Sequence, residues 1–221
     1  SLEGETYPLH VGDTWREPAA AARLEAFTVE DHPGMHRYTA PQGHPALLKA
    51  ASRHWDIAPE RILVTAGATA GLSVVAGTLL EPADEVLILA PHWPLISGIV
   101  STNQGVPVRV PFYDRSGSVA DLLAPFLTDK TVALYLNTPS NPTGRVLDAA
   151  TMGALAAFAR EHGLWLWADD IYEDYVYEGQ HISMRHLAPE RTFTALSFSK
   201  AWGMAGNRVG VILGPEDPGI S

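Results

Sequence analysis

The residue with the most distinctive chemistry is Lys200, in the stretch SFSKAWGMAGNRVG that runs from Ser197 to Gly210. This lysine follows the strand-like run FTALSFS and lies among small and aromatic residues, with Arg208 eight positions later. An amine that is partly shielded from water can act as a nucleophile or as a base. Small and apolar neighbours are unusual around a solvated lysine, so we expect Lys200 to be a site residue rather than an ordinary surface lysine.

Other polar and aromatic residues follow apolar runs elsewhere in the chain. Ligands of open parallel sheets bind beyond the carboxyl ends of the strands, so we expect these residues to meet at one edge. Free amides at a helix start can hold a phosphate. Each residue alone could equally be a turn, cap or packing residue. The set comprises Gly67-Ala68-Thr69, His92 with Trp93, Asn141, Asp169 with Asp170 and Tyr172, and Ser197.

Seven short apolar runs are the elements that must position these residues. Most are apolar throughout, which is typical of strands covered on both faces. Helical patterns lie between several of them, at 70–80, 118–127 and, most clearly, 148–162, where Asp148 is a capping candidate and Gly163 a terminator. The predicted strands are 62–65, 86–90, 106–110, 131–136, 164–168, 193–197 and 208–213.

This alternation predicts an α/β fold, a three-layer sandwich with a mainly parallel seven-stranded sheet between helices. Arg208 begins the last run instead of following it. If that strand is antiparallel to the others, Arg208 joins the remaining site residues at the same edge. We therefore predict an antiparallel last strand.

Composition narrows the class of protein. The chain has 221 residues, 25 acidic and 15 basic, for a net charge of -10, which disfavours nucleic acid and anionic membranes as partners. It has no cysteine, so disulfides, thiolate zinc sites and thiol nucleophiles are excluded, and we expect no metal site. No apolar run approaches the length of a spanning helix. We expect a cytoplasmic protein.

The order of six motifs, GAT, PHW, NPTG, DDIY, SFSK and NRVG, resembles the pyridoxal-phosphate-dependent aminotransferases of fold type I, the class I and II family. The likeness extends over nearly the whole chain. It implies that Lys200 forms a Schiff base with pyridoxal 5'-phosphate and then moves the proton at the substrate's α-carbon. The implied reaction is transamination between an amino acid and a 2-oxo acid.

The resemblance assigns a role to each site residue. Asp169 would pair with the pyridine nitrogen of the cofactor, and Asn141 and Tyr172 would donate to its phenolic oxygen. Trp93 would stack on the ring. Ala68, Thr69, Ser197 and Arg208 would hold the phosphate.

Two earlier residues complete the implied site. Tyr38 resembles the tyrosine that reaches the neighbouring subunit's cofactor phosphate, so a homodimer is implied. Gly12 resembles the arm glycine near the substrate carboxylate, where Asn141 would also contribute. Their simpler interpretations are a buried tyrosine and a turn.

The expected domain organisation is an N-terminal arm over residues 1–30 and a cofactor-binding large domain over 31–221. The C-terminal small domain of the family, which binds the substrate's α-carboxylate, is expected to be absent from this chain, which could therefore be inactive by itself. Two other functions stay open. One is a lyase of the same fold, of the carbon-sulfur lyase or aminocyclopropane-carboxylate synthase type, and the other is the effector-binding domain of a transcription regulator.

Overall fold

A seven-stranded sheet forms the centre of the protein, in the order β1-β7-β6-β5-β4-β2-β3. The computed structural model describes residues 12, 17–113 and 115–216. The strands are β1 (Ile62–Thr65), β2 (Glu85–Ala90), β3 (Val106–Pro111), β4 (Thr131–Asn137), β5 (Trp165–Asp169), β6 (Thr192–Ser197) and β7 (Gly210–Leu213). The predicted strands therefore all exist, most with ends shifted by a residue or two.

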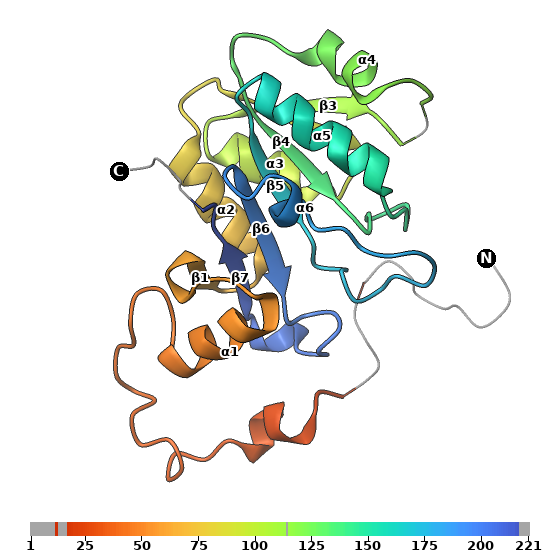
Figure 1. Cartoon of the computed structure of the whole chain (residues 1–221). Coiled ribbons are helices and arrows are strands. Elements are labelled where there is room, and N and C mark those ends of the chain that lie inside the picture. Colours follow the sequence, from red (N-terminus) through yellow and green to blue (C-terminus); the bar gives the residue numbers. More distant parts are fainter. Residues whose placement is uncertain (1–11, 13–16, 114, 217–221) are drawn as a thin grey trace, which may run out of the picture.

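Helices cover both faces of the sheet (Figure 1). The α-helices are α1 (Pro45–Trp55), α2 (Ala68–Leu79), α3 (Leu95–Thr102), α4 (Val119–Leu123), α5 (Ala149–Glu161) and α6 (Met184–Leu187). Short 3-10 helices are η1 (Ala20–Ala22), η2 (Leu24–Ala26), η3 (Pro59–Arg61), η4 (Ala124–Phe126) and η5 (Ala205–Asn207). Among the described residues, no helix has the length and apolar character needed to cross a membrane.

Alternate residues of the central strands pack into separate cores. In β5, Trp167 packs with α2 and α3, whereas Leu166 and Ala168 pack with α4, α5 and α6. Helix α1 packs through Leu48 and Trp55 against the β1, β6 and β7 end of the sheet. Both faces are buried, which explains why the strands are apolar at successive positions. The three-layer α/β fold is confirmed.

The last strand is antiparallel, as predicted. β7 lies between β1 and β6 and runs antiparallel to both, with Gly210 opposite Thr65 and Ser197. The other strand pairs are parallel. The start of β7 therefore meets the carboxyl ends of β1 and β6.

One boundary was wrong. The seventh strand begins at Gly210 and not at Arg208, because Arg208 adopts a left-handed conformation with φ 52° and ψ 52°. That conformation cannot continue a strand, whose φ is strongly negative. Arg208 is instead the residue that turns the chain from η5 towards β7.

Candidate active site

A cavity of about 430 Å³ opens at the carboxyl edge of the sheet. Every residue to which the family resemblance assigns a role, except Tyr38, lines it, together with residues that the sequence did not single out. Gly67, His92 and Asp170, which were also expected at this edge, are not among its lining residues. The predicted lining residues are Gly12, Ala68, Thr69, Trp93, Asn141, Asp169, Tyr172, Ser197, Lys200 and Arg208. The additional ones are Leu72, Pro94, Ile171, Ser199 and Ala205. Residues from six separate segments thus converge on one volume.

Asp169 ends β5 at the floor of this cavity and is 2% exposed. Its Oδ2 accepts a hydrogen bond of 2.6 Å from the hydroxyl of Tyr135, in β4. Its Oδ1 is buried and has no hydrogen-bond partner among the described residues. Burial raises the pKa of Asp169 to about 6, although the Tyr135 hydrogen bond lowers it. A buried acid with one unpaired oxygen is ready for a cationic or N–H donor partner.

The loop after β4 is tied to Asp169 through Asn137, the last residue of β4. The Asn137 side chain donates to the Asp169 carbonyl oxygen at 2.7 Å and accepts from the Asn141 backbone N–H at 2.6 Å. The Asn141 side chain in turn hydrogen-bonds Tyr172. Burial and the Asp169 charge raise the pKa of Tyr172, so its hydroxyl remains a donor at neutral pH. The predicted pair of donors, Asn141 and Tyr172, is therefore brought together beside Asp169.

Lys200 lies in the same cavity, three residues after the end of β6. Its Nζ donates to the carbonyl oxygen of Gly12 at 2.5 Å. A Cβ at residue 12 would lie 3.2 Å from this nitrogen, so a side chain there would crowd the amine. Gly12 thus lies at the point of the cavity where the predicted nucleophile lies.

The other end of the cavity is built to hold an anion. Helix α2 begins at Ala68, so the first backbone N–H groups of the helix lack intrahelical partners and form the positive end of the helix dipole. Gly67 has φ 86°, and a Cβ there would lie 2.5 Å from Nη2 of Arg208. Gly210 is equally constrained, because its Cβ would lie 2.6 Å from the Ala68 nitrogen. The two glycines allow the guanidinium and β7 to approach the helix start closely.

These features fit pyridoxal phosphate. The cofactor offers a phosphate dianion, an aromatic ring, a ring nitrogen and an aldehyde. The cavity provides an arginine with helix amides, the indole of Trp93, a buried carboxylate with an unpaired oxygen and a lysine amine. Arg208 suits the phosphate because a guanidinium can bind two oxygens at once.

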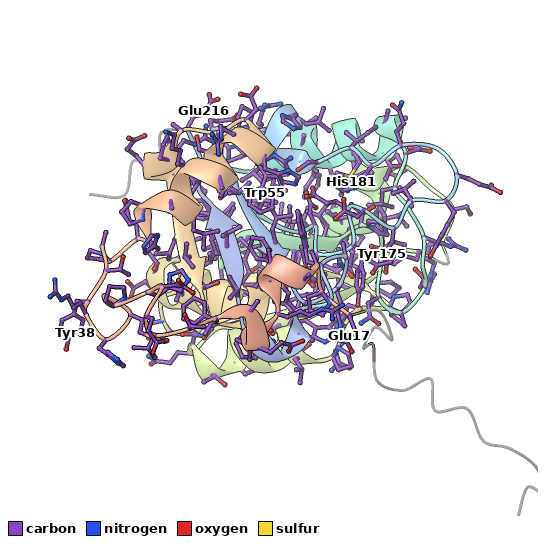
Figure 2. All side chains as sticks on the ribbon, turned by 90° about the horizontal axis from the view of Figure 1, so that it is seen from below. Glu17, Tyr38, Trp55, Tyr175, His181 and Glu216 are labelled. Atoms are coloured by element: carbon purple, nitrogen blue, oxygen red, sulfur yellow. The ribbon has the colours of Figure 1, made fainter. Side chains whose placement is uncertain are left out.

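Tyr38 is not part of this cavity. It lies in the segment before α1, is fully exposed and lines a separate surface hollow with Phe27, Met35 and His44. Figure 2 shows it projecting outwards at the periphery of the molecule. This position is compatible with a contact to a second subunit, which stays a prediction.

A buried ionic cluster supports the chain just after Asp169. Arg185, from α6, lies 3.7 Å from both Asp170 and Glu173, and His181 lies 3.3 Å from Asp170. Burial would lower the pKa of His181, but the hydrogen bond and charge of Asp170 outweigh it and raise that pKa. Asp170, Glu173 and His181 are close enough to one another to ligate a metal. The Arg185 guanidinium already supplies positive charge there, so we interpret the cluster as structural.

Sequence reasoning missed two residues that contact Asp169, namely Tyr135 and Asn137. Tyr135 looks like one more apolar position of the run 131–136. A tyrosine in a strand covered on both faces needs a partner for its hydroxyl, and that requirement could have identified it. Asn137 ends the same strand and could have been found as a buried amide in NTPSNPTG.

The comparisons with known proteins agree with this geometry. Residues 7–218 match the sequence model of the family described as Aminotransferase class I and II. The chain belongs to this family. The family membership predicted from the six sequence motifs is confirmed.

Similar proteins include aminotransferases that are named for different substrates. A probable aspartate/prephenate aminotransferase of Thermus aquaticus is 38% identical over 191 residues, which are 83% of this chain and 50% of that protein. Among solved structures, tetra mutant 1 of the Thermus thermophilus aspartate aminotransferase gives a TM-score of 0.82 at 30% identity, over 93% of this chain and 58% of that one. The aromatic aminotransferase from Pyrococcus horikoshii gives 0.84 at 29% identity, over 93% and 58%. The chain spans about half the length of the curated relatives it matches.

Proposed function

We propose that the protein is an enzyme that catalyses transamination between an amino acid and a 2-oxo acid. It would use pyridoxal phosphate, joined to Lys200 as a Schiff base. The observation that carries this proposal is the unpaired buried oxygen of Asp169 in the same cavity as the Lys200 amine. Pyridoxal phosphate, when bound, supplies an electron sink for the carbanion formed at the substrate's α-carbon.

Each residue of the cavity would have a separate role in the reaction. Lys200 would supply the amine that joins the cofactor and would carry the proton at the α-carbon. Asp169 would keep the pyridine nitrogen protonated by its negative charge. Asn141 and Tyr172 would donate to the phenolic oxygen, and Trp93 would pack against the ring.

The phosphate would be bound at the α2 end of the cavity. Ala68 and Thr69 contribute backbone amides, Thr69 and Ser197 contribute hydroxyls, and Arg208 contributes its guanidinium. The substrate would enter beside Gly12 and Asn141. The relatives are named for aspartate, prephenate, arginine with pyruvate, and aromatic amino acids, so we propose an amino acid and 2-oxo acid pair without choosing among them.

We further propose a homodimer in which Tyr38 reaches the partner's phosphate site. Large apolar side chains are exposed along residues 24–38, a segment that includes Leu24, Val29 and Met35. Apolar surface of this kind in one segment indicates a contact with another protein surface.

Reduction with borohydride tests the function directly. Protein incubated with pyridoxal phosphate should become yellow, and borohydride should fix the cofactor on the peptide that contains Lys200, as found by peptide mass analysis. Lys200→Ala should take no label, and Lys49→Ala, in α1, is the matched control that should label normally. A label on any other lysine in the unmodified protein would contradict the assignment.

An activity assay separates the proposed reaction from the lyase alternative. The protein is incubated with an amino acid, 2-oxoglutarate and pyridoxal phosphate. Glutamate formation supports transamination. Release of pyruvate and ammonia in its place would identify a lyase.

A further inference from the structure

We propose that Tyr135 is a positioning residue whose buried hydroxyl keeps Asp169 ionised and leaves Oδ1 as the oxygen that meets the pyridine nitrogen. This inference rests on the proposed function, because it concerns how Asp169 is prepared for that role.

The sheet register explains why Tyr135 reaches Asp169. In the parallel pair β4 and β5, Tyr135 lies opposite Trp167, and both pack into the core under α2 and α3. Asp169 is two positions further along β5, so it points to the same face. A diagonal neighbour of this kind lies within reach of an aromatic side chain. The hydrogen bond from Tyr135 Oη to Asp169 Oδ2 is 2.6 Å long.

The contact determines which oxygen of Asp169 remains available. Tyr135 is 0% exposed, so its hydroxyl has no access to water as an alternative partner. Oδ2 is occupied by this hydroxyl, while Oδ1 is buried without a partner. The Asn137 side chain binds the Asp169 backbone carbonyl and not the carboxylate. Tyr135 thus holds one carboxylate oxygen in place and leaves Oδ1 unpaired, in a residue that lines the cavity.

The charges around Asp169 explain why a donor is needed. Burial raises the pKa of Asp169, the hydrogen bond from the Tyr135 hydroxyl lowers it, and the neighbouring Asp170 charge raises it again, with a net value of about 6. Tyr172 and Lys200 also face the cavity. Burial and the Asp169 charge raise the pKa of Tyr135 well above its usual value, so it stays protonated and can only donate to Asp169. Without this donor, the acid would be neutral over more of the physiological pH range.

The test compares Tyr135→Phe with the unmodified protein, both without cofactor. The ionisation of Asp169 is followed by ¹³C NMR of the aspartate carboxyl carbons against pH, and Asp169→Asn identifies its signal. We expect the Asp169 midpoint to rise by about one to two pH units in Tyr135→Phe, the size expected for one hydrogen bond to a charged group. An unchanged midpoint would overturn the proposal.

Tyr113→Phe is the matched control. Tyr113 is also buried, but its hydroxyl donates to the Asn137 carbonyl oxygen at 3.1 Å and not to the Asp169 carboxylate. Its removal should leave the Asp169 midpoint in place. An equal shift in both variants would mean a general loosening of the core, which also overturns the proposal. If Tyr135→Phe does not fold, a fluorotyrosine placed at position 135 should lower the midpoint, because its more acidic hydroxyl is a stronger donor. No lowering would refute the role.

Cofactor binding is the second measurement. At pH 7, pyridoxal phosphate should bind Tyr135→Phe about two to ten times more weakly than the unmodified protein, because a midpoint raised by about one to two pH units leaves roughly a half to a tenth of the acid ionised. The difference should shrink at pH 9, where the acid ionises in both proteins. A difference that is the same at both pH values would contradict positioning through ionisation. Failure of the proposed function is distinguishable, because it would appear as absent binding in the unmodified protein, whereas the NMR midpoints would still test Tyr135.

Discussion

Gly67→Ala tests the anion-binding end of the cavity. Gly67 has φ 86° and ψ 164°, a conformation that costs a residue with a Cβ about 1–3 kcal/mol. The new methyl carbon would lie 2.5 Å from Arg208 Nη2 and 3.1 Å from its Cζ. The guanidinium is the end of a flexible side chain, so it can move away. We expect modest destabilisation of the fold and displacement of Arg208.

The displacement of Arg208 should also weaken the binding of pyridoxal phosphate. Losing one hydrogen bond to a charged group costs about 1.5–3 kcal/mol, which corresponds to a dissociation constant about 10 to 150 times larger. Stability is measured by urea unfolding without cofactor, and affinity by absorbance titration. Gly163→Ala is the control, since Gly163 has φ 68° but its Cβ would meet nothing within 4 Å. It should cost about 1 kcal/mol of stability and leave the affinity unchanged.

A double-mutant cycle with Arg208→Met decides whether the two residues act together. If Gly67→Ala acts by moving the guanidinium, it should weaken binding very little when Arg208 is already methionine. Independent, additive losses of affinity would refute the reasoning, as would an unchanged affinity in Gly67→Ala alone.

Two further predictions concern buried charge. The folded-state pKa of Asp169 is about 6, above the 3.8 of the unfolded chain, so the cofactor-free protein should lose about 2–3 kcal/mol of its free energy of unfolding through this group as pH rises from 4 to 7. Urea unfolding across that pH range should show a smaller loss of stability for Asp169→Asn. Equal losses in the two proteins would contradict the burial argument. Arg185→Met should cost about 3–5 kcal/mol by removing the guanidinium that pairs with the buried Asp170 and Glu173. The exposed ion pair between Arg160 and Glu190 is the control. Arg160→Met removes this pair and should cost at most about 1 kcal/mol of stability. Similar losses of stability in Arg185→Met and Arg160→Met would argue against a buried ionic support.

The strands and several caps could be predicted because their causes are local. The run 62–65 is a strand because both of its faces are covered, and β1 has those bounds. Asp148 accepts a hydrogen bond from the Thr151 backbone N–H at 2.7 Å, so the predicted cap of α5 is confirmed. The helix predicted over 118–127 is correct only at its start. It passes into η4 at Ala124, where Pro125 lacks the N–H that an α-helix needs.

What the sequence could not provide depends on contacts between distant segments. Helices α1 and α3 were not predicted, and the order of strands in the sheet does not follow from their order in the chain. The role of Tyr135 requires the register of β4 against β5, which aligns it diagonally with Asp169. Arg185 and Asp170 are 15 residues apart and meet because α6 packs back onto β5. The motif residues could be predicted because each follows the end of a strand, and the ends of parallel strands meet at one edge of the sheet.

The place of β7 has a consequence for biosynthesis. Of the strands in the described sheet, β1 has one neighbour, and that neighbour is β7, about 150 residues later. During translation, β1 therefore has no hydrogen-bonding strand until Leu213 has left the ribosome. The helix start at Ala68 and the arginine at 208 can meet only after that step, so the anion-binding end of the cavity should form in one step and not gradually as the chain grows.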